Sequence, residues 1–238
     1  MALRNDFEER KNEVCLYIDL LQNISKPGQK FCKIDQRQRN ILFANLYLLL
    51  YNLIESTVCK CEEELTQEFS QHSLLNISLY IEKIKSQWIM TISQAHNQNM
   101  QERETGVKKL FEKLLDIENN TLGADFRFKK STNVDNTVVE DAFTSYGIPL
   151  EIDKNLKTEI SCHRRNNEGL TQLIRNERNA LAHGNKSFVE SGQDITFSDA
   201  KQYANIIFKY LESIIASLES FISEKKYLCA YSKKDKPS

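Results

Sequence analysis

The chain has 238 residues, a formal net charge of −1, 40% apolar residues, and only 7 Gly and 3 Pro. This composition favours long helices over a turn-rich β-sandwich, and the small net charge excludes an overall field that attracts nucleic acid. Residues 1–14 are rich in charge and contain no apolar signal segment, so we expect a cytoplasmic protein with reduced cysteines.

Apolar residues recur at helical spacing through most of the first half of the chain. They predict helices over 3–24, from about 35 to about 70, over 76–96 and over 102–117. The most apolar run, ILFANLYLLLYNLI at 41–54, is too short to span a bilayer and contains two Asn. It therefore indicates a buried helix rather than a membrane span.

Residues 118–160 differ from the helical segments on either side. The stretch 118–136 is polar and rich in helix breakers, which predicts a loop or a short hairpin. The stretch 137–149 predicts a short helix that Gly147 caps and Pro149 stops. We therefore expect an all-α, up-and-down helical bundle whose two halves are separated by a mixed or loop-rich insertion over 118–160.

Two helices are predicted after the insertion. The first covers about 166–183, and the second begins at TFSD, where Thr196 and Asp199 have capping-box spacing, and runs to about Tyr227. The apolar stripe of the second consists of Ile207, Leu211, Ile214, Leu218 and Phe221. We expect one domain over 1–228, followed by a basic, disordered tail over 229–238.

The first of these helices contains LIRNERNALAHGN at 173–185 and has two distinct faces. At about 100° per residue, its leucines and isoleucine fall within about 80° of Leu170 and form the core stripe. On the same scale Arg178 falls at about 80°, Asn179 at about 180° and His183 at about 220°. Arg178 and His183 therefore border a face that does not point at the core.

Two further features of this helix lead to predictions. Gly184-Asn185 fits a left-handed C-cap, which leaves His183 on the final turn. Glu177 falls in the middle of the apolar stripe, where an unpaired carboxylate is costly. We therefore expect a buried partner for Glu177, which the sequence does not name.

The predicted helix from about 35 to about 70 carries an unusual polar stripe. Asn45, Asn52, Glu55 and Ser56 fall within a wedge of about 100° on a helix that is otherwise Leu, Ile and Tyr. Polar groups aligned in this way either satisfy one another or line a site. Both interpretations remain open from the sequence, and in the second the wedge supports the face of Arg178 and His183.

A basic turn, CHRR at 162–165, precedes the helix of Arg178. His163, Arg164 and Arg165 either grip phosphates that flank a site or form a solvated turn. Cys59-x-Cys61 does not have zinc-knuckle spacing, and a remote metal site that uses Cys162 and His163 stays open as a minor alternative. We expect no metal and no other cofactor.

The sequence RNERNALAHG resembles the signature of the HEPN superfamily, which is an Arg, a polar residue, a few variable positions and a His near a helix end. Arg178, Asn179 and His183 occupy these positions. The segments 45–58 and 184–212 are similar to the second helix and to the helix after the motif in small stand-alone prokaryotic HEPN proteins, which are regarded as toxins or anti-phage effectors.

This resemblance implies a helical bundle that dimerises through the motif helices and brings two Arg-His pairs into one cleft. It implies a metal-independent endoribonuclease, with RNA as substrate and an antitoxin or defence-system protein as a further partner. Some HEPN proteins are regulated by modification of a Tyr two positions after the His. Asn185 stands at that position here, which argues against this form of regulation.

The residue types suit RNA cleavage without a metal. A neutral His183 imidazole can take the proton from a ribose 2′-hydroxyl, and the Arg178 guanidinium can hold the scissile phosphate. Asn179 would orient the phosphate or the imidazole, and Arg175 would add a phosphate contact. The expected products are a 2′,3′-cyclic phosphate and a 5′-hydroxyl from single-stranded RNA.

Two alternatives from other functional classes remain. The first is a non-catalytic HEPN-fold module that binds RNA, a nucleotide or a protein through Arg178 and His183. The second is a structural helical adaptor, in which the same face is a protein interface. An RNase assay separates the enzyme from both.

Overall fold

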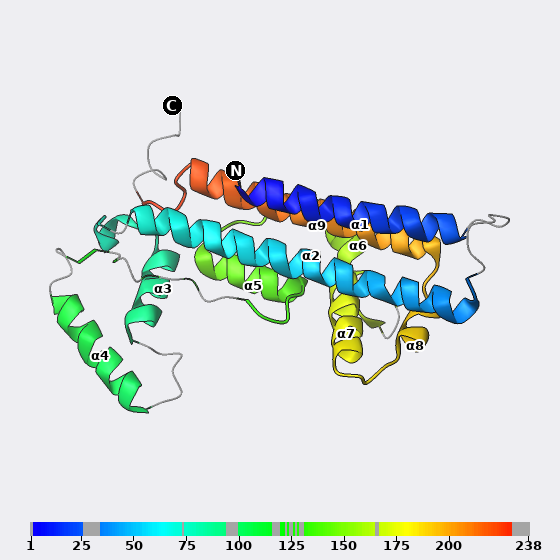
Figure 1. Ribbon diagram of the computed structural model, residues 1–238. Helices are drawn as coiled ribbons and strands as arrows, with labels where there is room; N and C mark the ends of the chain where they lie inside the picture. Colours follow the sequence, from blue (N-terminus) through cyan, green and yellow to red (C-terminus); the bar gives the residue numbers. More distant parts are fainter. Residues whose placement is uncertain are drawn as a thin grey trace. The chain divides into compact units, whose positions relative to one another are not determined.

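The computed structural model describes residues 2–25, 34–72, 74–93, 100–115, 120–121, 123, 126, 128, 131–164 and 167–229. Over this part of the chain the regular structure is helical, and the protein is an all-α bundle of the predicted class (Figure 1). The α-helices are α1 (Ala2–Ser25), α2 (Gln36–Gln71), α3 (Glu82–Ser93), α4 (Met100–Leu115), α5 (Asn136–Tyr146), α6 (Lys154–Ser161), α7 (Leu170–Ala182), α8 (Phe188–Gly192) and α9 (Phe197–Ser223).

The chain divides into two compact units. One consists of Met1–Lys60, Ser131–Val139 and Glu151–Ile215, and the other of Cys61–Lys130, Glu140–Leu150 and Ala216–Ser238. The long helices α2 and α9 contribute residues to both units, while α1, α6, α7 and α8 belong to the first. All of the candidate site residues predicted from the sequence lie in the first unit.

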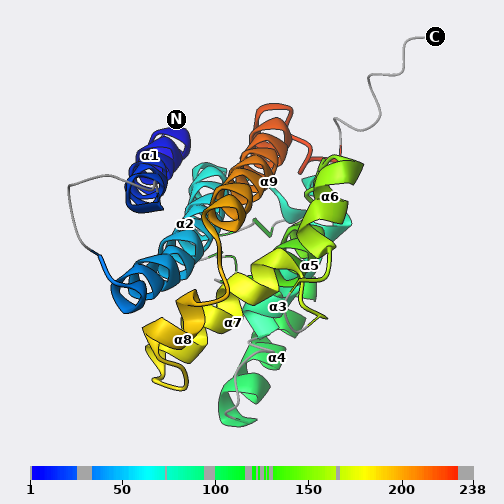
Figure 2. The same cartoon turned by 90° about the vertical axis from the view of Figure 1, so that its right-hand side faces the viewer.

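In the first unit, α1 and the parts of α2 and α9 that belong to it run alongside one another (Figures 1 and 2). The predicted stripe of α9 is buried in this unit at Ile207, Leu211 and Ile214. Polar contacts join α1 to both neighbours: the Tyr17 hydroxyl donates to the Leu42 carbonyl at 2.6 Å, and Lys11 Nζ lies 2.7 Å from Glu212 Oε1. Burial of apolar side chains, together with this hydrogen bond and this ion pair, holds the three helices together.

The short helix α8 packs very closely on the start of α2. A Cβ atom on Gly192 would lie 1.8 Å from the Asn40 carbonyl oxygen, so only glycine fits this approach. The Asn40 side-chain amide also donates to the Val189 carbonyl at 3.3 Å. These contacts fix the segment that follows α7 against α2.

The second unit has an aromatic core. The Phe69 ring lies within 6 Å, between ring centroids, of four other rings, those of Tyr80, Phe126, Phe128 and Tyr227. The Tyr227 hydroxyl donates to Glu68 Oε1 at 2.6 Å, which satisfies its polar end inside this cluster. Packing between aromatic rings thus stabilises the second unit. The first unit is stabilised by the buried apolar faces of its helices and by ion pairs.

Several local predictions are confirmed. The Thr196 hydroxyl accepts from the Asp199 N–H at 3.2 Å while the Asp199 carboxylate accepts from the Thr196 N–H at 3.0 Å, as a capping box requires. Gly147 ends α5 with a φ of +80°, a left-handed value that favours glycine. The apolar run 41–54 lies within α2, a helix that by length and composition is long and apolar enough to cross a membrane, and 56% of its most apolar window is buried in the protein.

Several predicted elements were wrong in their bounds. The helix predicted over about 166–183 is α7, which begins at Leu170, and the helix predicted to run to about Tyr227 is α9, which ends at Ser223. The helix predicted over 76–96 is a 3-10 turn (Ile77–Leu79) followed by α3, because the Asn76 side chain accepts the Ser78 N–H and caps the turn separately. The insertion over 118–160 contains α6 in addition to the predicted short helix. Asp153 caps α6 by accepting from the Asn155 and Leu156 N–H groups, a signal that the sequence analysis missed. Beyond Cys229 the predicted tail lies outside the described residues.

Candidate functional site

The end of α7 places His183 at the surface. His183 is the C-cap residue, Gly184 has a φ of +70°, and the Asn185 N–H donates to the Ala180 carbonyl at 2.9 Å. The Gly184 N–H donates to the Leu181 carbonyl at 3.2 Å, which completes the Schellman pattern. The His183 side chain is exposed, and within the described part of the chain its imidazole has no hydrogen-bond partner.

Arg178 lies against two residues of α2. Its Cζ atom stands 4.0 Å from the centroid of the Tyr51 ring, and its Nη2 lies 3.5 Å from Glu55 Oε2. The Nη1 atom donates to the Asn179 side-chain oxygen at 2.8 Å. The Arg178 side chain nevertheless remains 29% exposed. Its guanidinium is therefore held in place and still open to solvent.

Tyr51 itself is buried and fully hydrogen-bonded. Its hydroxyl donates to Glu55 Oε1 at 3.2 Å and accepts from the Val134 N–H at 3.2 Å. Burial raises the pKa of Tyr51, the Glu55 carboxylate raises it further, and the Arg178 cation opposes the increase. The residue at the base of this site is thus a neutral phenol at ordinary pH.

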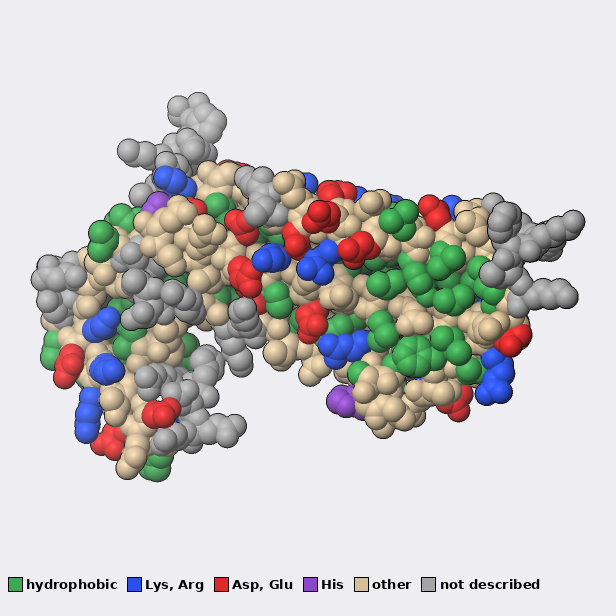
Figure 3. Space-filling model, viewed as in Figure 1, with side chains coloured by type: hydrophobic (Ala, Val, Ile, Leu, Met, Phe, Trp, Pro, Cys, Tyr) green, Lys and Arg blue, Asp and Glu red, His purple; other side chains and the backbone are tan. Residues whose placement is uncertain are grey.

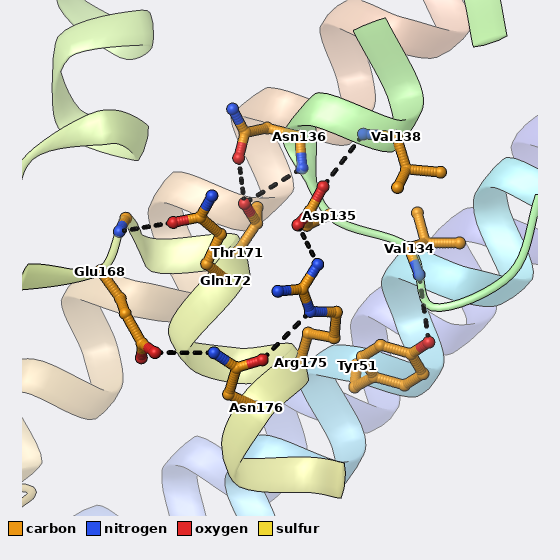
Figure 4. Close-up of polar contacts among 11 residues, drawn as sticks. Tyr51, Val134, Asp135, Asn136, Val138, Glu168, Thr171, Gln172, Arg175 and Asn176 are labelled. Atoms are coloured by element: carbon orange, nitrogen blue, oxygen red, sulfur yellow. Dashed lines mark hydrogen bonds and ion pairs between the residues drawn. The ribbon is translucent and has the colours of Figure 1, made fainter. Parts of the chain in front are cut away.

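Arg175, one turn before Arg178, is in a different environment (Figure 4). Its Nη1 forms an ion pair with Asp135, a carboxylate that is only 3% exposed. Its Nε donates to the Asn176 side-chain oxygen at 3.2 Å, and the Asn176 amide donates to Glu168 Oε1 at 2.7 Å. Arg175 thus neutralises a buried charge, and its role as a phosphate ligand stays a prediction.

Glu177 has the buried partner that the sequence required. Its carboxylate accepts from Lys186 Nζ at 2.8 and 3.0 Å and from the Ser191 hydroxyl at 2.5 Å. Lys186 follows the C-cap of α7, and Ser191 lies in α8. The buried carboxylate therefore fastens the segment after His183 to α7.

The polar stripe of α2 does not act as one set. Glu55 reaches Arg178, but the Asn45 amide donates to the Ile41 carbonyl at 2.9 Å and the Ser56 hydroxyl to the Leu53 carbonyl at 3.1 Å, both within α2. Asn52 is exposed. Glu55 is thus the member of the stripe whose contact with Arg178 is seen, and the places of Asn45 and Asn52 at the site stay predictions.

The basic turn before α7 is partly structural. Arg164 donates to the Cys162 and Glu159 carbonyls, each at 2.9 Å, and its Cζ lies 5.3 Å from the Tyr203 ring centroid. His163 is exposed, and Arg165 lies outside the described residues. Among the residues that the structure describes, no three His, Cys, Asp or Glu side chains gather closely enough to hold a metal ion.

Charge near the site is local. On the face shown in Figure 3, basic and acidic side chains alternate over α1 and α2, and apolar side chains gather over the N-terminal part of α2. This mixture agrees with the net charge of −1. An anion at this site would therefore depend on individual groups, above all the Arg178 guanidinium, rather than on a broad basic surface.

Sequence reasoning missed Tyr51 and Asp135. Tyr51 stands four residues before Glu55, one helical turn away, so the helix period that defined the polar stripe also contained the signal for Tyr51. Asp135 is far from α7 in the sequence, and no spacing connects it to Arg175. Only the fold brings these two charges together.

The arrangement combines an exposed imidazole at a helix end with an anchored, partly exposed guanidinium five residues before it. An imidazole transfers protons near neutral pH, and a guanidinium holds an oxyanion with paired donors. Together, an imidazole and a guanidinium can transfer protons at a phosphate ester and stabilise the charge on its oxygens.

Comparisons with known proteins show the family of the chain. A family model described as HEPN_MAE_28990-like HEPN matches residues 1–227. No curated protein and no solved structure matches the chain. Because the match covers nearly the whole sequence, including α2 and α7, the chain belongs to the HEPN_MAE_28990-like HEPN family.

Proposed function

We propose that the protein is a metal-independent endoribonuclease that cleaves single-stranded regions of RNA. The observation that carries the proposal is the pair on α7: His183 is exposed at the C-cap, and Arg178 is anchored by α2 while its side chain stays 29% exposed. Family membership supports an RNase or a nucleotide-binding module at this fold. The chemistry of the pair favours the RNase.

The proposed reaction uses the RNA itself as nucleophile. The His183 imidazole takes the proton of a ribose 2′-hydroxyl, whose oxygen attacks the adjacent phosphorus, and the bond from phosphorus to the 5′-oxygen breaks. Arg178 holds the non-bridging oxygens as negative charge builds on them, and Asn179 orients Arg178. The products are a 2′,3′-cyclic phosphate and a 5′-hydroxyl.

A homodimer would complete the site. Ala182 is exposed and small, and together with Asn179 it allows a second copy of α7 to approach the same face closely. A two-fold contact is the commonest way for two identical helices to meet. His183 of the second copy would then protonate the leaving 5′-oxygen. Sedimentation at micromolar concentration should give a dimer, and a strict monomer would exclude this composite site.

The biological role proposed with this activity is that of a cytoplasmic toxin or anti-phage effector. Cleavage of cellular or phage RNA would arrest growth, which calls for a cognate antitoxin or a defence-system partner that restrains the protein. Induced expression in a bacterial host should stop growth with the wild type and not with His183→Ala.

The decisive assay measures cleavage of a single-stranded RNA by purified wild type, His183→Ala and His72→Ala. His72 is the control histidine, because it belongs to the other unit and has no role in the proposed site. We expect His183→Ala to lose about 10²–10⁴-fold in rate, the usual contribution of a proton-transfer group, and His72→Ala to stay near the wild-type rate. A strand with deoxyribose at the cleaved position should resist cutting.

Two results would refute the enzyme. Folded His183→Ala that cleaves at the wild-type rate removes the proton-transfer role. Abolition of cleavage by EDTA, with rescue by a divalent ion, contradicts metal independence. RNA binding without cleavage by the wild type would instead favour the non-catalytic HEPN-fold binding module.

A further inference from the structure

Tyr51 has the contacts of a residue that sets the geometry of another side chain. It is 2% exposed, its ring lies under the Arg178 guanidinium, and both functions of its hydroxyl are used. A core tyrosine requires none of the contacts with charged groups. Packing in the core alone therefore does not explain the contacts of Tyr51 with Arg178 and Glu55.

The position of Tyr51 in the sequence explains how it acts together with Glu55. The two residues are four apart on α2, so both side chains lie on one face of the helix. Their shared hydrogen bond, 3.2 Å from the hydroxyl to Glu55 Oε1, fixes the ring and the carboxylate as a pair. The ring then supports the plane of the guanidinium, and Glu55 Oε2 faces its Nη2.

A short segment before α5 holds this pair in place. The Val134 N–H donates to the Tyr51 hydroxyl at 3.2 Å, Asp135 pairs with Arg175, and the Asn136 N–H donates to the Thr171 hydroxyl at 3.1 Å (Figure 4). Three consecutive residues thus bind α2 once and α7 twice. The ring of Tyr51 is consequently fixed relative to the helix that carries Arg178.

The contacts of Arg178 leave donors free for a ligand. A guanidinium has five N–H donors, and in the described residues its hydrogen bonds to Asn179 and Glu55 use two of them. The Cζ atom of the group lies over the Tyr51 ring, 4.0 Å from its centroid. Stacking and hydrogen bonding fix the orientation of the fork, while the remaining N–H groups can bind phosphate oxygens.

We propose that Tyr51 is a positioning residue, which with Glu55 holds the Arg178 guanidinium in the orientation needed to bind the scissile phosphate. The proposal rests on the proposed ribonuclease function. Tyr51 does not touch RNA in this account. Its removal leaves Arg178 present but free to adopt other rotamers, so the rate of the chemical step falls more than the affinity for RNA.

The first test compares two buried tyrosines of α2. Tyr51→Leu should lower the single-turnover cleavage rate about tenfold, which lies between the worth of an exposed and of a desolvated cation–π contact, with binding of a 2′-deoxy substrate analogue changed less than twofold. Tyr47→Leu is the matched control, because Tyr47 is 1% exposed and lies one turn earlier. Rates are taken per folded molecule, with Tyr51→Met as the second variant where Tyr51→Leu fails to fold.

The second test uses chemical rescue. Arg178→Ala should lose most cleavage, and added guanidinium ion at sub-denaturing concentration should restore at least part of it by occupying the place above the ring. Adding Tyr51→Phe, which keeps the ring, should preserve the rescue. Adding Tyr51→Leu should abolish it.

The outcomes separate this inference from the proposed function. Arg178→Ala that cleaves like the wild type would overturn the ribonuclease site itself. If Arg178→Ala is inactive while Tyr51→Leu cleaves at the rate of Tyr47→Leu, and guanidinium rescues with or without the ring, the positioning role is overturned and the ribonuclease remains. Loss of rescue only without the ring supports the positioning role.

Discussion

The first half of α7 carries Arg175 and its second half carries Arg178, three residues apart on one helix. Arg175 pairs with Asp135, which is 3% exposed, whereas Arg178 meets Glu55, which is 35% exposed, at 3.5 Å. The burial of the acidic partner distinguishes the two halves. A buried carboxylate needs its cation permanently, so Arg175 serves the fold. A half-exposed carboxylate can orient a cation without occupying all of its N–H donors. Arg178 therefore keeps donors that can bind a ligand.

The largest effect on stability should come from the first half. Asp135→Ala leaves Arg175 without its partner and removes the acceptor of the Val138 N–H at the start of α5. We expect the free energy of unfolding to fall by about 3 kcal/mol, as on breaking a buried ion pair, with a lower Tm in thermal denaturation. Cleavage per folded molecule should fall less than in Arg178→Ala, because the Val134 N–H still holds the Tyr51 hydroxyl. A loss below about 1 kcal/mol would show that Arg175 and Asp135 behave as a surface pair.

The second largest effect on stability should come from Glu177, another buried carboxylate. Glu177→Ala leaves the buried Ser191 hydroxyl without its acceptor and Lys186 without its counter-charge, so about 1–3 kcal/mol of stability should be lost. Glu177→Gln keeps an acceptor for Ser191 and should cost less. Urea denaturation of the two variants measures the difference. Equal losses would mean that the charge of Glu177, rather than its hydrogen bonds, carries the effect.

In the second half of α7, a substitution should lower the cleavage rate more than the stability. Glu55→Ala removes a half-exposed partner, so the free energy of unfolding should change by less than about 1 kcal/mol. Cleavage should nevertheless fall, because Arg178 and the Tyr51 hydroxyl both lose a contact. Parallel denaturation and single-turnover measurements test this. A variant that is strongly destabilised but cleaves normally per folded molecule would place Glu55 with Asp135 as a structural residue.

The smallest effect concerns alkaline pH. The folded pKa of Tyr51 lies above its unfolded value of 10.0, mainly because of burial, so folding favours the protonated phenol. Its contribution to stability is fully present below pH 10 and is lost as the pH rises through the folded pKa. A spectrophotometric titration of wild type minus Tyr51→Phe should show one phenol that ionises above pH 10. Ionisation at or below pH 10 would contradict the buried, hydrogen-bonded environment.

Local signals predicted much of the fold. The capping box at Thr196, the left-handed Gly147 and the α9 stripe depend on residues within a turn or two of one another, so periodicity and cap chemistry were sufficient. The segment 76–96 was predicted as a single helix because its apolar spacing continues through the Asn76 turn. The Asn76 side chain caps the 3-10 turn separately from α3, and this local signal was missed.

The candidate site was predictable only where it depends on residues close together in the sequence. Arg178 and His183 stand on one helix, and the face that they border follows from its period. The roles of Arg175 and Arg178 do not follow from α7 alone, because both lie beside the core stripe. Their distinction depends on Asp135 and Tyr51, which approach from other segments. Contacts between residues so far apart in the sequence can be known only from the three-dimensional structure.

The most direct test of the central claim makes the same change in both halves of α7. Arg175→Lys and Arg178→Lys each keep the positive charge, but a lysine lacks the planar fork that stacks on Tyr51 and grips a phosphate with paired donors. Measured as single-turnover RNA cleavage per folded molecule, Arg175→Lys should stay within about twofold of the wild type, and Arg178→Lys should fall by about tenfold or more. Equal rates for the two variants, or a wild-type rate for Arg178→Lys, would contradict the account.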